Sequence, residues 1–185
     1  MISEDQEDRG MVERKVGDRK LRLVNGDITE VEVDAFVFDI TEDVKLGSGF
    51  GAAIQQRGGI VIQKQLDEIG RCPTGEAIVT EAGILKADWI IHANGPKFRE
   101  EDEEAKLRKT IGAALARAEE KGVKTLAFPP VGTGLYQVPM DLCARVMVDT
   151  VAEHLAGETS LREVLFVVPD SRERVAFEAR IQEGA

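Results

Sequence analysis

Residues 36–51, FVFDITEDVKLGSGFG, decide the fold. The stretch begins as a nearly apolar run and ends in a Gly-rich loop that contains Gly47, Gly49 and Gly51. A strand that leads through such a loop into a helix can hold a phosphate, because backbone N–H groups approach the anion closely. However, three carboxylates that would repel an anion lie between the apolar run and the loop: Asp39, Glu42 and Asp43. The stretch therefore predicts a strand-loop-helix unit, and other segments have to indicate its ligand.

Alternating runs on both sides of this stretch predict the rest of the fold. Residues 34–39, DAFVFD, suit a strand covered on both faces. We expect the other strands at 12–16, 20–25, 76–80, 89–93, 125–128 and 163–168. We expect helical segments from about 51 through 70, at 100–122, at 139–156, and from a cap at Asp170 to about 183. This alternation predicts a three-layer α/β/α sandwich with a mixed, mostly parallel central sheet.

Length and composition predict one globular domain. The chain has 185 residues, of which 43% are hydrophobic and 31% charged, so we expect a mobile acidic tail at 1–10 and a single domain at 11–185. The acidic start does not resemble a signal peptide, and no apolar run approaches the roughly 20 residues of a membrane span. We therefore expect a cytoplasmic protein. Cys72 and Cys143 follow no zinc-binding spacing and are expected to be reduced.

The formal net charge of −10 excludes two kinds of partner. Non-specific binding to nucleic acid depends on Lys and Arg that replace counterions, and adsorption to anionic lipid depends on the same charges. We therefore expect neither non-specific binding to nucleic acid nor a membrane as a partner. An anionic ligand would have to be held by a local arrangement of donors, because the overall field repels it.

Two further segments resemble parts of a nucleotide site. Residues 127–139, AFPPVGTGLYQVP, place a second Gly-rich loop between a strand and a helix. Tyr136 in this loop is either a packing residue or a flat wall against a sugar. In NGDIT, residues 25–29, Asp27 either caps a local helix or accepts the amino group of an adenine. Two anion-type loops at neighbouring strand ends could together hold a diphosphate.

Taken together, these segments give the chain a resemblance to the macro domain, a module whose members bind ADP-ribose. The resemblance covers about residues 20–168. It rests on six blocks in order: VNGDIT (24–29), DAFV (34–37), GSGFGAAI (47–54), CPTGEA (72–77), IIHANGP (90–96) and AFPPVGTGLYQVP (127–139). Their order and separations are those of the family.

The resemblance implies a set of binding residues. Asp27 would hold the adenine amino group beside the Ile28 backbone. The first loop would wrap the diphosphate and the distal ribose with Gly47, Ser48, Gly49, Phe50 and Gly51. The facing loop would contribute Val131, Gly132, Thr133, Gly134, Leu135 and Tyr136, with the tyrosine near the distal ribose. His92, in the H-x-x-G-P strand, is interpreted as an oriented core histidine.

The chain departs from the family at its Val-Asn-Ala-Ala-Asn motif, where residues 37–41 read VFDIT. The Asn and Asp used by hydrolytic members correspond here to Thr41 and Gly51. Neither can act as a general base near neutral pH, so the catalytic residues stay open, with Asp39 and Asp43 as candidates. Binding is less affected, because its phosphate contacts come mainly from backbone N–H groups.

Three interpretations of Asp39, Glu42 and Asp43 remain: they face solvent, they hold Mg²⁺ or Ca²⁺ beside the ligand, or they replace the missing catalytic pair. No cofactor is required for binding. We favour a module that binds ADP-ribose, a derivative or an ADP-ribosylated protein. The alternatives are a hydrolase and a degenerate fold that acts as a scaffold or binds another metabolite. The hydrolase would remove ADP-ribose from protein, deacetylate O-acetyl-ADP-ribose or dephosphorylate ADP-ribose-1″-phosphate.

Overall fold

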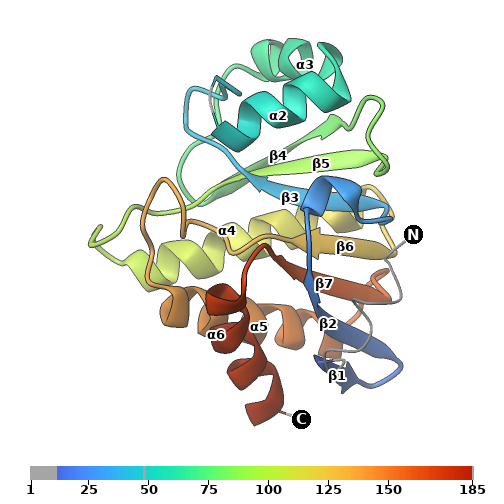
Figure 1. Cartoon of the computed structure of the whole chain (residues 1–185), viewed down its shortest axis with the longest axis vertical. Coiled ribbons are helices and arrows are strands. Elements are labelled where there is room, and N and C mark those ends of the chain that lie inside the picture. The colour runs from blue at the N-terminus through green and yellow to red at the C-terminus, as the bar shows by residue number, and fades with distance from the viewer. Residues whose placement is uncertain (1–11, 48, 185) are drawn as a thin grey trace.

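A computed structural model describes residues 12–47 and 49–184, so the predicted tail 1–10 lies outside the described residues. Within that part of the chain, seven strands form one sheet in the order β1-β2-β7-β6-β3-β5-β4 (Figure 1). The strands are β1 (Val12–Val16), β2 (Arg19–Asn25), β3 (Ala35–Asp39), β4 (Glu76–Glu81), β5 (Trp89–Asn94), β6 (Thr125–Phe128) and β7 (Glu163–Val168). The helices are η1 (Ile28–Glu30), α2 (Gly49–Gly58), α3 (Val61–Ile69), α4 (Glu103–Glu120), α5 (Met140–Ala156) and α6 (Ser171–Glu183).

The sheet is mixed, and its central strands are parallel. β2, β7, β6, β3 and β5 run in one direction. β1 and β4 pair antiparallel to their neighbours at the two edges. β7, the last strand in the chain, lies between β2 and β6. The predicted mixed, mostly parallel sheet is confirmed.

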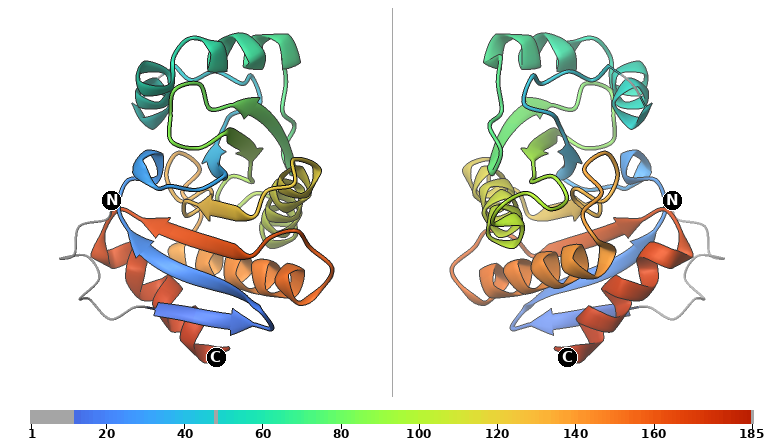
Figure 2. Two further views of the ribbon diagram at one scale, coloured as in Figure 1. Left: turned by 90° about the vertical axis from the view of Figure 1, so that its right-hand side faces the viewer. Right: turned by 90° about the vertical axis from the view of Figure 1, so that its left-hand side faces the viewer.

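Two apolar cores lie on opposite faces of the sheet, because alternate side chains of each strand point to opposite faces. On β3, Ala35 and Val37 pack into the core under α4, α5 and α6. Phe36, from the same strand, packs into the core that includes Ile54 of α2 and Leu66 of α3. Figures 1 and 2 show the resulting layers. The strand at 34–39 is thus covered on both faces, as its composition predicts.

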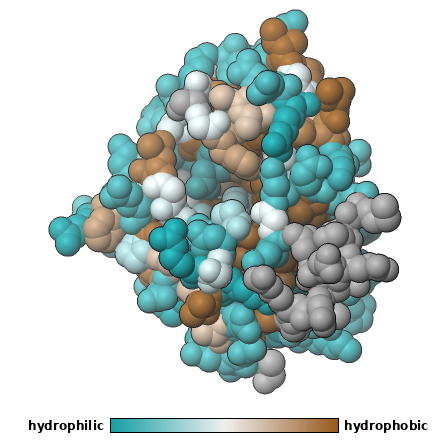
Figure 3. Space-filling model, in the orientation of Figure 1, coloured by the Kyte–Doolittle hydropathy of each residue, from teal (hydrophilic) through white to brown (hydrophobic). Residues whose placement is uncertain are grey.

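The helix expected from about 51 and the second helical stretch expected through 70 are α2 and α3. The break between them lies at Gly59–Ile60. The turn between β4 and β5 packs beside it: the Ile84 N–H donates to the Gly58 carbonyl at 3.1 Å. At the C-terminal end, Asp170 accepts from the N–H groups of Arg172 and Glu173 and caps α6 as predicted. No helix of the described residues is both long and apolar enough to cross a bilayer. The face shown in Figure 3 is mostly hydrophilic.

The contact between Gly83 and Gly58 predicts an unequal response to two alanine substitutions. A Cβ on Gly83 would lie 1.8 Å from the Gly58 carbonyl oxygen, whereas Gly122, with a similar φ of +65°, has nothing within 4 Å. In Gly122→Ala, the only loss of stability comes from holding an alanine in the left-handed backbone conformation, which costs roughly 1–2 kcal/mol. We expect Gly83→Ala to lower the Tm clearly further in thermal unfolding, where 1 kcal/mol corresponds to roughly 2–4 °C at this size. Equal losses would contradict this packing.

Candidate functional site

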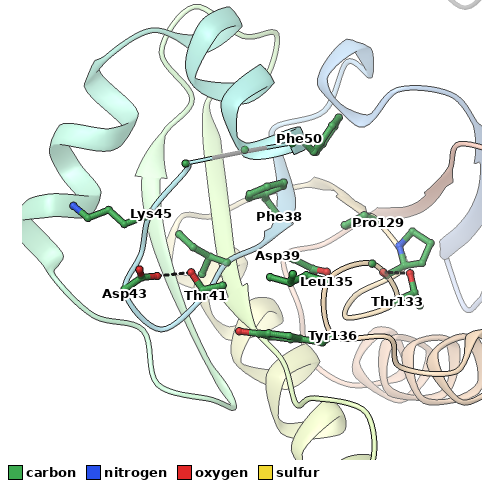
Figure 4. A pocket seen from close by; sticks show the side chains of 16 residues that line it. Phe38, Asp39, Thr41, Asp43, Lys45, Phe50, Pro129, Thr133, Leu135 and Tyr136 are labelled. Atoms are coloured by element: carbon green, nitrogen blue, oxygen red, sulfur yellow. Dashed lines mark hydrogen bonds between the residues drawn. The ribbon is translucent and has the colours of Figure 1, made fainter.

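A cavity of about 680 Å³ lies where β3 and β6 end (Figure 4). Three segments line it: the end of β3 with the residues that follow, the Gly-rich loop that leads into α2, and residues 129–130 with 133–136. The carboxyl ends of neighbouring parallel strands meet at one edge of a sheet, which is where α/β proteins bind ligands. The structure therefore brings the two predicted loops together.

Gln63 of α3 makes two hydrogen bonds to the backbone of the first loop. Its Oε1 accepts from the Leu46 N–H at 3.0 Å, and its Nε2 donates to the Val44 carbonyl at 3.2 Å. α2 then begins at Gly49, and the N–H groups in the first turn of a helix have no partner within the helix. The predicted residues Gly47, Gly49, Phe50 and Gly51 all line the cavity. Ser48 lies outside the described residues.

The second loop is built by its own hydrogen bonds. The Val138 N–H donates to the Gly132 carbonyl at 2.9 Å and the Gln137 N–H to the Gly134 carbonyl at 3.2 Å. The predicted residues at the cavity are Thr133, Gly134, Leu135 and Tyr136. Within residues 12–47 and 49–184, the N–H groups of the last three have no hydrogen-bond acceptor. They are therefore free to bind an anion.

Val131 and Gly132 lie behind this surface and do not line the cavity. Both are buried, and the Val131 N–H points to the Met147 sulfur at 3.4 Å. The Gly132 N–H donates to Asp39 Oδ2 at 2.8 Å. Two of the predicted binding residues thus have their N–H groups engaged inside the protein.

Aromatic side chains form opposite walls of the cavity. Phe38 and Phe50 pack together on one side, with ring centroids 5.7 Å apart, and Tyr136 lies on the other (Figure 4). The Tyr136 hydroxyl donates to Asn94 Oδ1 at 3.2 Å, which fixes the ring. Leu135 is 78% exposed beside the opening. Phe38 could be identified from the sequence only as a departure from the family motif. Its position in the cavity wall became clear only from the fold.

Asp27 does not line the cavity and is the cap of η1. Its Oδ1 accepts from the Thr29 N–H at 2.9 Å and the Thr29 hydroxyl at 2.7 Å, and its Oδ2 accepts from Arg57 at 2.7 Å. Partial burial acts to raise the pKa of Asp27, but these hydrogen bonds outweigh it and hold the pKa below its ordinary value. Ile28 is buried in the core beneath α2 and α3.

The three acidic residues at and after the end of β3 have three different environments. Asp39 Oδ2 accepts from Gly132, and its Oδ1 is enclosed without a hydrogen-bond partner. Burial raises the pKa of Asp39 to about 6. Asp43 lines the cavity and accepts from the Thr41 hydroxyl, whereas Glu42 lies outside it and pairs with Arg71. In residues 12–47 and 49–184 no group of three or more His, Cys, Asp or Glu is arranged to hold a metal ion.

His92 is a core residue, as interpreted from the sequence. It is fully buried, and its Nε2 lies 2.9 Å from the Thr80 hydroxyl oxygen. Burial lowers the pKa of His92 to about 3, so the ring is neutral. The residue does not line the cavity.

The enclosed carboxylate of Asp39 predicts a pH-dependent stability difference. Because its pKa rises from 3.8 to about 6 on folding, ionisation costs stability, and this cost grows between about pH 4 and pH 6. Asp39→Asn keeps an acceptor for Gly132 and removes the charge. We expect the variant to gain stability relative to the native protein as pH rises through this window, by at most roughly 3 kcal/mol. Urea unfolding at several pH values measures this difference.

Asp43→Asn is the matched control, since Asp43 is exposed. Its stability relative to the native protein should change little across the same window. A parallel pH profile for Asp39→Asn and the native protein would show that the Asp39 carboxylate is not desolvated.

Comparison with known proteins gives the family. The macro domain model matches residues 40–147. A macro domain-containing protein of Caldanaerobacter subterraneus is 36% identical over 170 residues, which cover 89% of this chain and 97% of the relative. The Oceanobacillus iheyensis macrodomain with ADP has a TM-score of 0.88 at 24% identity, over 94% of this chain and 96% of that one. The Trypanosoma brucei macrodomain in complex with ADP-ribose has a TM-score of 0.80 at 25% identity, over 86% of this chain and 68% of that one. The chain belongs to the macro domain family.

Proposed function

We propose that the protein binds ADP-ribose or a close derivative in the cavity at the ends of β3 and β6. The observation that carries the proposal is the meeting of two Gly-rich loops at one cavity between aromatic walls. Membership of the macro domain family supports it, as do the macrodomain structures with ADP and with ADP-ribose. The diphosphate would lie between the start of α2 and residues 134–136.

The adenine end of this ligand would lie beside Asp27. An ionised carboxylate offers about four lone-pair positions, and Thr29 and Arg57 use three of them. One position is left for the adenine amino group, so the pair with Arg57 does not prevent the contact. The cap of η1 and the proposed adenine contact are therefore compatible roles of the same side chain.

An ADP-ribosylated protein is a second form of the ligand that we propose, because the exposed side chain of Leu135 lines the cavity and is accessible to an attached protein. Cys72 and Cys143 are free and buried, which supports the proposed cytoplasmic location. Binding in this form requires no cofactor, since the proposed contacts come from the chain's own N–H groups and rings.

Phe50 and Phe98 offer a matched test of the proposal. Both are phenylalanines of nearly equal exposure, 43% and 42%, but only Phe50 lines the cavity. In calorimetric titration with ADP-ribose we expect Phe50→Ala to weaken binding about tenfold, since it removes an aromatic contact. Phe98→Ala should stay within about twofold of the native protein. If the native protein gives no heat with millimolar ADP-ribose, the proposal is wrong. If Phe50→Ala and Phe98→Ala weaken binding equally, the ligand binds elsewhere.

Asp39 supports a second candidate, hydrolysis of an ADP-ribose derivative. It is a carboxylate beside the cavity whose pKa of about 6 lies near the range useful to a general base. Asp43 lines the same cavity and is exposed. Either could activate water in place of the residues missing at Thr41 and Gly51.

Turnover assays decide this second candidate. ADP-ribosylated protein, O-acetyl-ADP-ribose and ADP-ribose-1″-phosphate are offered to the native protein, to Asp39→Ala and to Asp43→Ala. If one of these carboxylates is the base, its removal should lower turnover about 100-fold or more. Turnover unchanged in both variants would exclude the role for both residues.

A further inference from the structure

One end of the cavity offers hydrogen-bond acceptors and negative charge. We define this acidic end as Asp39, Thr41, Asp43 and Tyr136, all of which line the cavity. The Thr41 hydroxyl donates to Asp43, and the Tyr136 hydroxyl donates to Asn94. Both hydroxyl protons are therefore used inside the protein, and what remains for a ligand are oxygen lone pairs.

Two lysines lie near this end: Lys45 lines the cavity, and Lys97 places its Nζ 6.0 Å from the centroid of the Tyr136 ring. Lys45 is the one basic residue among the described residues that line the cavity. Its Nζ pairs with Asp67 at 2.6 Å and points away from Tyr136 (Figure 4). Burial raises the pKa of Tyr136, and the carboxylates of Asp39, Asp43, Glu100 and Glu42 raise it further, in decreasing order.

Asp39 also removes a donor from the second loop. The Gly132 N–H lies in the segment that would otherwise present its backbone to an anion, but it donates to Asp39 Oδ2 at 2.8 Å. Gly132 itself does not line the cavity, so its N–H is not offered to an anionic group of a ligand. The donor-rich part of the cavity is restricted to the start of α2 and residues 134–136.

We propose that the acidic end selects a ligand whose distal group donates hydrogen bonds and carries positive charge, and that it rejects an anionic distal group. This inference rests on the proposed function, since it names the chemistry of the group attached to the distal ribose. Suitable groups are a pyridinium, an ammonium or a guanidinium. The faces of Phe38 and Tyr136 would add cation–π attraction to the pull of the carboxylates.

Three ligands that differ at the distal ribose test this selectivity. NAD⁺ carries a cationic pyridinium there, ADP-ribose a neutral hydroxyl, and ADP-ribose-1″-phosphate a phosphate. In calorimetric titration we expect NAD⁺ and ADP-ribose each to bind at least about tenfold more tightly than the phosphate. In Asp43→Asn the ratio between NAD⁺ and the phosphate should fall about fivefold or more, because one charge at this end is removed.

Glu42→Gln is the control, because it removes the same charge from the neighbouring residue, whose side chain pairs with Arg71 outside the cavity. In Glu42→Gln, the ratio between the affinities for NAD⁺ and for the phosphate should stay within about twofold of the native value. Thermal unfolding confirms that each variant is folded. If ADP-ribose binds but the phosphate binds as tightly as NAD⁺, or if both variants change the ratio equally, the acidic end does not set the selectivity. If none of the three ligands binds, the result contradicts the proposed function itself, and the selectivity inferred from it falls with it.

Discussion

The parallel pairing of β3 with β6 is the constraint on which the site depends. Ala35 and Phe36 lie opposite Leu126 and Ala127, so the two strands leave the sheet at the same edge. The loop after β3 and the loop after β6 must therefore face each other, although about ninety residues separate them in the chain. Neither loop could form the cavity alone, because each supplies one wall and one set of backbone donors.

The hydrogen bond from Gly132 to Asp39 joins these two loops directly. It places a carboxylate where desolvation is unfavourable, as the enclosed Oδ1 shows. A buried carboxylate is tolerated when geometry or function requires it, and here it fixes the second loop against the end of β3. The same carboxylate also lines the cavity and brings negative charge to it. One interaction thus stabilises the site and limits what the site can bind.

Local patterns in the sequence were enough to predict the strands, the helices and the two loops. The apolar run at 34–39 and the cap at Asp170 are examples, since each depends on residues close in the chain. The partners of the polar residues could not be predicted in this way. Arg57 meets Asp27 across 30 residues, Arg71 meets Glu42 across 29, and Gly132 meets Asp39 across 93. These contacts depend on how the layers pack, so the sequence left the direction of each carboxylate open.

The cavity has two ends of opposite polarity, and this difference orients an asymmetric ligand. The start of α2 and residues 134–136 present N–H dipoles, which favour negative charge without adding a cation. The end around Asp43 and Tyr136 presents lone pairs and negative charge, which favour donors. A ligand that carries a diphosphate and a cationic distal group would, if it were turned end for end, exchange favourable contacts for repulsion at both places. Because the chain as a whole carries a charge of −10, attraction between protein and ligand has to come from these short-range contacts. The arrangement of neutral donors, more than the sum of charges, therefore decides which ligand binds and in which direction.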